Sequence, residues 1–206
     1  MSGGQFQQVF AQSAGEGREP EPTWAPPEWF GPLDTELGVI IPLSLVAARS
    51  ERSVIAVKSA TAYSTGVVFD LVALARGLSE REANRLMHEQ HLVGGDDEPS
   101  DALLRVGFEL SDGSRISNLG RRPLLDPSAE PDGPVLSPVG GGGGSAGGGR
   151  LSMEYGYWLW PLPPSGPLRI YVEWPALDIG LTHAELDAGA LREAADRSQK
   201  IWPESS

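Results

Sequence analysis

Three aromatic residues near the end of the chain have the spacing best suited to recognition chemistry. Trp158, Trp160 and Tyr171 stand in two runs of alternating apolar and polar residues, 151–160 and 168–174. Such period-two alternation is typical of strands that bury one face. If the two runs pair as an antiparallel hairpin, all three rings point outward. Aromatic rings on an outer face can contact a partner protein, a proline-rich peptide or a sugar ring.

The hairpin register that places the rings outside sets Leu159 opposite Ile170. An apolar patch on a solvent-facing sheet is normally either covered or used for binding. Cover would come from the closing helix, the glycine-rich loop or the aromatic segment Trp24–Phe30. The same register predicts an inward-facing set of side chains, namely Met153, Tyr155, Tyr157, Leu159, Leu168, Ile170, Val172 and Trp174.

A second arrangement with chemical potential is the pair His88 and His91, which is followed by the acidic run Asp96–Glu98. Two imidazoles three residues apart can share a helix face, and nearby carboxylates could complete a metal site. The zinc-protease pattern requires His-Glu-x-x-His, and this run is one residue short. A histidine near a helix C-terminus also suits the helix dipole. We therefore expect a solvated helix end, with no metal and no cofactor.

Lys58 and Asp70 interrupt two apolar runs that are successive strands. A buried charge in such a strand needs a partner, so we expect these two residues to pair with each other. A catalytic pair is the less favoured alternative. The chain also contains no cysteine, which excludes a thiol nucleophile, and no Gly-x-Ser-x-Gly elbow. We predict no catalytic residue and lean against an enzyme.

The net charge of the chain limits the classes of partner that we expect it to bind. The 206 residues include 28 acidic and 16 basic side chains, which gives a net charge of −12. A negative surface repels phosphate backbones, so a nucleic acid is not an expected partner. No apolar run approaches the roughly 18 residues of a membrane span, and no signal peptide is visible. The sequence thus predicts a cytoplasmic protein without a membrane partner.

Composition divides the chain into a tail and one domain. Residues 1–33 are predicted to be a flexible tail rich in Pro, Gly and Glu, with Trp24–Phe30 docking on the domain or on a partner. Residues 34–206 are predicted to form one domain. Its glycine-rich segment, 120–149, lacks the Gly-Lys-Ser/Thr of a phosphate-binding loop and is typical of a flexible linker.

Local signals place the elements of this domain. Pro42 predicts an edge or bulged position for the first strand, since proline cannot donate to a ladder. Ser79 and Glu82 form a capping box that starts a helix ending near residue 91. Asp187 is expected to cap a closing helix over 188–202. Strands are predicted at 38–47, 53–63, 66–75, 103–110, 114–119 and 181–186, and the closing helix should bury Leu191, Ala194, Ala195, Ser198, Ile201 and Trp202.

The turn after the fourth of these strands sets a register. A three-residue loop ending at Gly113 pairs Phe108 with Ile116 and Glu109 with Arg115. This register matches apolar with apolar and opposite charges with each other, and it puts glycine in the left-handed bulge position.

Together these elements predict a mainly β fold, an antiparallel β-sandwich of immunoglobulin-like or jelly-roll outline, with one short inserted helix and a C-terminal helix. A partly open barrel is the alternative. The function predicted from sequence is a non-enzymatic interaction module that binds a protein or peptide through the aromatic sheet face. A carbohydrate-binding module is the alternative, and a metal-dependent hydrolase is less favoured.

Residues 60–70, 108–119 and 157–175 together resemble a group of uncharacterised (hypothetical) bacterial proteins with no assigned function. The resemblance covers most of the chain, from about residue 36 to 203, and omits the tail. It implies one compact domain and transfers no catalytic or binding residue.

Overall fold

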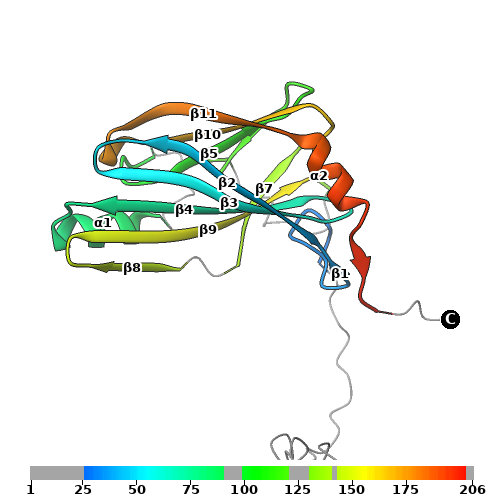
Figure 1. Ribbon diagram of the computed structural model, residues 1–206, viewed down its shortest axis with the longest axis horizontal. Helices are drawn as coiled ribbons and strands as arrows, with labels where there is room; N and C mark the ends of the chain where they lie inside the picture. The colour runs from blue at the N-terminus through cyan, green and yellow to red at the C-terminus, as the bar shows by residue number, and fades with distance from the viewer. Residues whose placement is uncertain (1–25, 91–98, 121–129, 141–142, 203–206) are drawn as a thin grey trace, which may run out of the picture.

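The computed structural model describes residues 26–90, 99–120, 130–140 and 143–202 (Figure 1). Trp24, His91, Asp96–Glu98 and most of the predicted tail lie outside these ranges. Within the described ranges, no helix is long and apolar enough to cross a membrane.

The fold is mainly β, and every strand pairing among the described residues is antiparallel. The larger sheet has six strands. Five of them follow the order β2-β3-β4-β9-β7, and the sixth, β8, also pairs with β9. Their bounds are β2 Val39–Arg49, β3 Ser53–Ala62, β4 Val67–Arg76, β7 Val135–Val139, β8 Gly144–Gly147 and β9 Arg150–Trp160.

The second sheet has four strands in the order β11-β10-β5-β6, and a short third sheet pairs β1 with β12. The bounds of these strands are β5 Arg105–Glu109, β6 Arg115–Ser117, β10 Pro167–Trp174, β11 Ile179–Asp187, β1 Glu36–Leu37 and β12 Gln199–Lys200. The helical segments are α1 Glu80–Glu89, the 3₁₀ turn η2 Pro175–Leu177 and α2 Ala188–Ala195.

The two larger sheets share one hydrophobic core, and Figure 1 shows β10 and β11 lying over β2, β3 and β4. Phe69 of β4 and Phe108 of β5 meet across it, with ring centroids 4.9 Å apart. The predicted inward residues of β10 are all buried, which confirms the alternation of that run. These residues are Leu168, Ile170, Val172 and Trp174.

Several local predictions are confirmed. Ser79 and Glu82 form both hydrogen bonds of the capping box at the start of α1. Pro42 lies in an edge strand, and the β2–β3 register shifts just after it. The hairpin of β5 and β6 pairs Phe108 with Ile116 and Glu109 with Arg115, and Gly113 has a φ of 87°. Each of these features depends on a few neighbouring residues, so the sequence was sufficient to predict it.

The predicted ion pair between Lys58 and Asp70 is wrong. Lys58 instead binds Glu154, with Nζ and Oε1 2.8 Å apart, and Asp70 accepts a hydrogen bond from Ser59. The prediction assumed two buried charges, but the Lys58 side chain is 47% exposed because it lies on the outer face of the sheet. An exposed lysine needs no specific partner, and β9 supplies the carboxylate that it binds.

The predicted closing helix is too long. Asp187 caps α2 as expected, through a hydrogen bond from the Gly189 N–H, but α2 ends at Ala195. The chain then leaves the helix to pair β12 with β1, and the Ile201 N–H donates to the Thr35 carbonyl. Ile201 and Trp202 are therefore exposed rather than on a buried stripe.

The segment 120–149 is not a plain flexible loop. It contains β7 and β8, which both pair with β9. Gly147 faces Arg150 across a two-residue turn in which Gly148 and Gly149 both have positive φ, 57° and 72°. Two consecutive left-handed residues are what a type I′ hairpin turn requires, and glycine adopts them without steric cost.

Candidate functional site

The predicted aromatic face does not exist, because its two strands do not pair. β9 lies between β4 and β7, whereas β10 lies between β5 and β11 in the other sheet. Leu159 faces Val67 and Leu136, and Ile170 faces Phe108 and Ala184. Residues 161–166 carry the chain from one sheet to the other instead of closing a hairpin. The outer sides of β9 and β10 therefore belong to different sheets.

Trp158 is on the outer side of β9, as the alternation predicted, but it is covered. Its exposed fraction is 0%. Its indole Nε1 donates to the Glu28 carbonyl at 3.0 Å, and the Tyr63 ring meets it edge-on at 5.7 Å. A Cβ added to Gly66 would lie 2.6 Å from the indole. Trp158 is thus an internal packing residue between the sheet and the N-terminal segment.

The other two residues of the predicted face are separated as well. Trp160 is partly buried and contacts the Trp29 ring, with centroids 6.0 Å apart. Tyr171 is partly exposed and lies against His183 of β11, with centroids 5.2 Å apart. Residues 28 and 29 thus cover the two tryptophans, while Tyr171 stands on the other sheet.

The structure also places His88. Its Nδ1 lies 2.7 Å from the Asn84 carbonyl oxygen, which can only accept, so Nδ1 carries the proton of that hydrogen bond. Among the residues that the structure describes, no group of three or more histidine and acidic side chains could hold a metal ion. His91 and the acidic run lie outside those residues.

The feature best suited to hold a ligand is a cavity of about 370 Å³ beside β9, which we call the tyrosine pocket. It opens where β9 changes its partner from β7 to β8. Cavities of ~300–1,000 Å³ are the usual size of small-molecule sites. The side chains that line it include Met87 and Gln90 of α1, Met153, Tyr155 and Tyr157 of β9, Leu103, Asn118, Leu136 and Val139.

Two features of the chain leave this space unfilled. The four-stranded sheet ends at β6, which has only three residues and so covers little of the inner face of β9. The wall between β7 and β8 includes Gly140, Gly143 and Gly144, which have no side chains to fill the gap. The pocket therefore follows from a short strand opposite a glycine-rich segment.

The two tyrosines give the pocket an aromatic wall. The rings of Tyr155 and Tyr157 are nearly parallel, at 7°, with centroids 6.2 Å apart. Burial raises the pKa of the Tyr155 phenol above its ordinary value, so it remains a protonated donor at neutral pH. Its hydrogen bond goes to the Met153 thioether at 3.4 Å, and a thioether is a weak acceptor. A ligand oxygen would be a stronger acceptor for the hydrogen bond that the Tyr155 hydroxyl donates.

The amide side chains of Gln90 and Asn118, which line the pocket, already form hydrogen bonds within the protein. The Gln90 amide bonds the carbonyls of Leu86 and Ala102 and the Leu104 N–H. The Asn118 amide bonds Val106 and Leu104 of the backbone and the Tyr157 hydroxyl, the last at 3.3 Å. These bonds hold α1 and the end of β6 in place and leave Tyr155 as the donor with the weakest partner.

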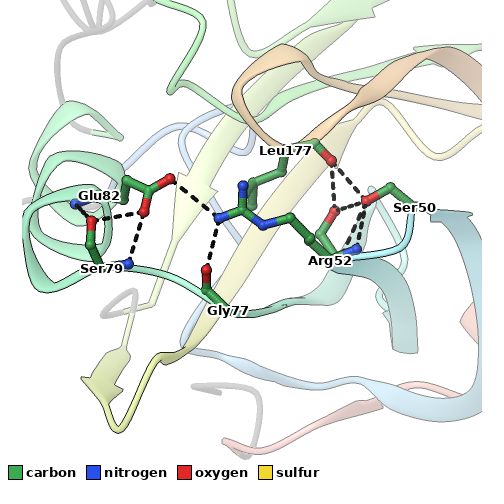
Figure 2. Close-up of polar contacts among 7 residues, drawn as sticks. Ser50, Arg52, Gly77, Ser79, Glu82 and Leu177 are labelled. Atoms are coloured by element: carbon green, nitrogen blue, oxygen red, sulfur yellow. Dashed lines mark hydrogen bonds and ion pairs between the residues drawn. The ribbon is translucent and has the colours of Figure 1, made fainter.

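The N-terminus of α1 is anchored to the β2–β3 turn, as Figure 2 shows. Arg52 Nη2 donates to the Gly77 carbonyl at 3.1 Å and to the Glu82 carboxylate at 3.2 Å. Glu82 also accepts from the backbone and hydroxyl of Ser79. The Ser79 backbone and side chain, together with Arg52, lower the pKa of Glu82 to about 2. These contacts determine where α1, and hence Met87, stands over the pocket.

The sequence predicted the pocket residues of β9 only as core, with Met153, Tyr155 and Tyr157 in the inward set of that strand. The signal that could have marked a cavity is the run of glycines that pairs with this strand, since glycines facing an inward row leave space. Because these glycines were interpreted as a flexible linker, the cavity was not predicted.

The chain matches no protein-family model, no curated protein and no solved structure.

Proposed function

We propose that this protein is a non-enzymatic binding module and that the tyrosine pocket is its ligand site. The observation that carries the proposal is a cavity of about 370 Å³ lined by stacked Tyr155 and Tyr157 and by two methionines, Met87 and Met153. Aromatic rings offer flat apolar area, and methionine adapts its shape to the molecule beside it. The ligand class is a small, flat, apolar molecule.

The electrostatics of the pocket support a neutral ligand with one hydrogen-bond acceptor. Among the described lining residues the only charged side chain is Glu154, which already pairs with Lys58. A charged ligand would leave water without gaining an opposite charge. The Tyr155 hydroxyl would donate to a carbonyl, ether or hydroxyl oxygen of the ligand.

The same residues support binding rather than catalysis. A general base works best with a pKa near the operating pH. Burial moves the pKa of Tyr155 away from that range, and Glu154 is held in an exposed ion pair.

We further propose that the two larger sheets form a β-sandwich of immunoglobulin-like or jelly-roll outline. The shared core and the ring contact between Phe69 and Phe108 support this arrangement. In such a fold the pocket is the uncovered end of the space between sheets.

A protein or peptide partner, a cytoplasmic location and kinship with the uncharacterised bacterial proteins stay predictions, as do the carbohydrate and hydrolase alternatives. The aromatic face of Trp158, Trp160 and Tyr171 is not proposed as the binding surface, because residues 28 and 29 cover the two tryptophans and Tyr171 stands on the other sheet.

The experiment uses two glycines of β8 that differ in where a side chain would point. A Cβ at Gly144 would lie 3.5 Å from the side chains of Met87 and Met153, so Gly144→Leu should fill the pocket. A Cβ at Gly147 meets nothing within 4 Å, so Gly147→Leu is the matched control. Both glycines are exposed residues of the same strand.

The probe is N-phenyl-1-naphthylamine, a neutral aromatic dye that fluoresces in apolar surroundings. We expect saturable binding to the full chain, at least ~tenfold weaker binding in Gly144→Leu, equivalent to ~1.4 kcal/mol, and unchanged binding in Gly147→Leu. Circular dichroism would confirm that both variants are folded. Wild-type chain that gives no saturable signal, or a folded Gly144→Leu variant that binds like wild type, would refute the assignment.

A further inference from the structure

A second concavity, of about 670 Å³, lies at the end of the six-stranded sheet where β2 turns into β3. Four arginines line it, Arg49, Arg52, Arg76 and Arg150, and the only carboxylate among its described lining residues is Glu51. We call it the arginine concavity. The chain as a whole carries a net charge of −12. The local charge at this end of the sheet is therefore opposite to the global charge.

The arginines are placed where they repel one another. Arg76 of β4 and Arg150 of β9 stand directly opposite in register. Both are exposed, and so is Arg49 at the end of β2. Like charges directly opposite in an antiparallel pair destabilise a sheet. An anion bound between them would relieve that repulsion.

Only one of the four arginines has its charge offset within the described residues. Arg52 pairs with Glu82, and Figure 2 shows this contact together with its bond to Gly77. Among the described residues, neither Arg49 nor Arg150 forms an ion pair.

The remaining guanidinium is held but not neutralised. Arg76 donates from Nε and Nη2 to the same acceptor, the Glu51 backbone carbonyl, at 3.1 and 2.9 Å. A carbonyl oxygen carries no net charge, so these bonds orient the guanidinium and leave its positive charge available. A pre-oriented arginine loses less side-chain freedom when it binds an anion.

Hydroxyl groups and an apolar surface complete the concavity. Ser145 and Ser152 face each other across β8 and β9, within the lining. Leu74, which faces Ser152 in the β4–β9 register, is 44% exposed. Guanidinium groups bind phosphate through paired hydrogen bonds, serine hydroxyls can add to them, and the leucine offers contact to an apolar group.

We propose that the arginine concavity binds the phosphate group of a soluble small molecule. Arg76 and Arg150 hold the phosphate from two strands, Arg49 adds charge from the edge, and the rest of the molecule lies over Leu74. The concave shape favours a small molecule over an extended surface.

This site is independent of the tyrosine pocket. The pocket uses the inward residues Met153, Tyr155 and Tyr157 of β9, whereas the concavity uses the outward residues Arg150 and Ser152. Either site can therefore fail experimentally without affecting the other.

The test uses inorganic pyrophosphate as the probe and isothermal titration calorimetry on the full chain. Arg150→Gln removes a charge that has no ion pair among the described residues, so the fold should be retained. Arg197→Gln is the control, because Arg197 is exposed just after α2, at the opposite end of the molecule from α1 (Figure 1). We expect saturable binding that weakens at least ~tenfold in Arg150→Gln and is unchanged in Arg197→Gln, because only the first variant removes a charge-assisted hydrogen bond to the phosphate.

Three results would overturn the proposal. Equal weakening in Arg197→Gln and in Arg150→Gln would show a non-specific charge effect. Cosedimentation with phosphatidylcholine vesicles containing phosphatidylglycerol, without any pyrophosphate binding, would show that the partner is a membrane surface. Absence of saturable heat with pyrophosphate at millimolar concentration would show that the arginines do not hold a phosphate group.

Discussion

Replacing Trp158 with alanine should destabilise the protein strongly, although Trp158 is on the outer side of its sheet. Its exposed fraction is 0%, and it packs between Tyr63, Gly66 and the segment around Glu28. Truncating a buried tryptophan to alanine costs ~3–5 kcal/mol. Loss of the hydrogen bond from Nε1 to the Glu28 carbonyl adds ~1 kcal/mol.

The measurement is urea unfolding followed by far-ultraviolet circular dichroism, with two companion variants. Trp158→Phe keeps a ring but removes the indole N–H, so it should lose less free energy of unfolding than the alanine variant. Trp202→Ala is the control, because Trp202 is 65% exposed, and its loss should stay within ~0.5 kcal/mol. A loss below ~1 kcal/mol for Trp158→Ala would show that residues 26–33 do not cover the indole in solution, and our description of that surface would be wrong.

Three further perturbations test local arguments. The pKa of Glu82 is lowered from 4.5 to about 2 in the fold, so its carboxylate stabilises the protein above pH 4.5 and loses that contribution as the pH falls through about 2. When unfolding is measured over that pH interval, Glu82→Gln should lose less stability than the wild-type chain. An unchanged pH profile would contradict the capping assignment. Gly66→Ala should cost ~1–3 kcal/mol, because its Cβ would lie 2.6 Å from Trp158, and a neutral result in chemical denaturation would argue against that contact. Gly148→Ala should cost ~1–2 kcal/mol because of its left-handed φ of 57°, whereas Gly147→Ala should not; equal melting of the two variants would exclude the type I′ turn.

Features determined by neighbouring residues could be predicted from the sequence. The capping box of Ser79 and Glu82 and the bulged turn at Gly113 depend on a few adjacent residues, and both were correct. The alternation of 151–160 and 168–174 also predicted the inward and outward sides of each strand correctly, because side-chain direction in a strand is a local property.

Features determined by distant parts of the chain could not be predicted. Adjacent runs in the sequence suggested a hairpin, but β9 and β10 each pair with a strand much earlier in the chain, as the pairing of Tyr157 with Phe69 and of Ile170 with Phe108 shows. Whether Trp158 is covered depends on the N-terminal segment, which lacks any periodic pattern. The tyrosine pocket arises where the three-residue strand β6 leaves β9 uncovered, and the glycines beside it mark a cavity only once their pairing with β9 is known.

The central claim, that the tyrosine pocket binds a small aromatic molecule, is tested most directly by nuclear magnetic resonance of methionine methyl groups. The chain has three methionines, and Met87 and Met153 line the pocket whereas Met1 precedes the described residues. In a titration of the ¹³C-methyl-labelled chain with N-phenyl-1-naphthylamine, the methyl signals of Met87 and Met153 should shift together and saturate, while that of Met1 stays in place. Dye binding with all three signals unmoved, or with the Met1 signal shifting as much as the others, would contradict the account.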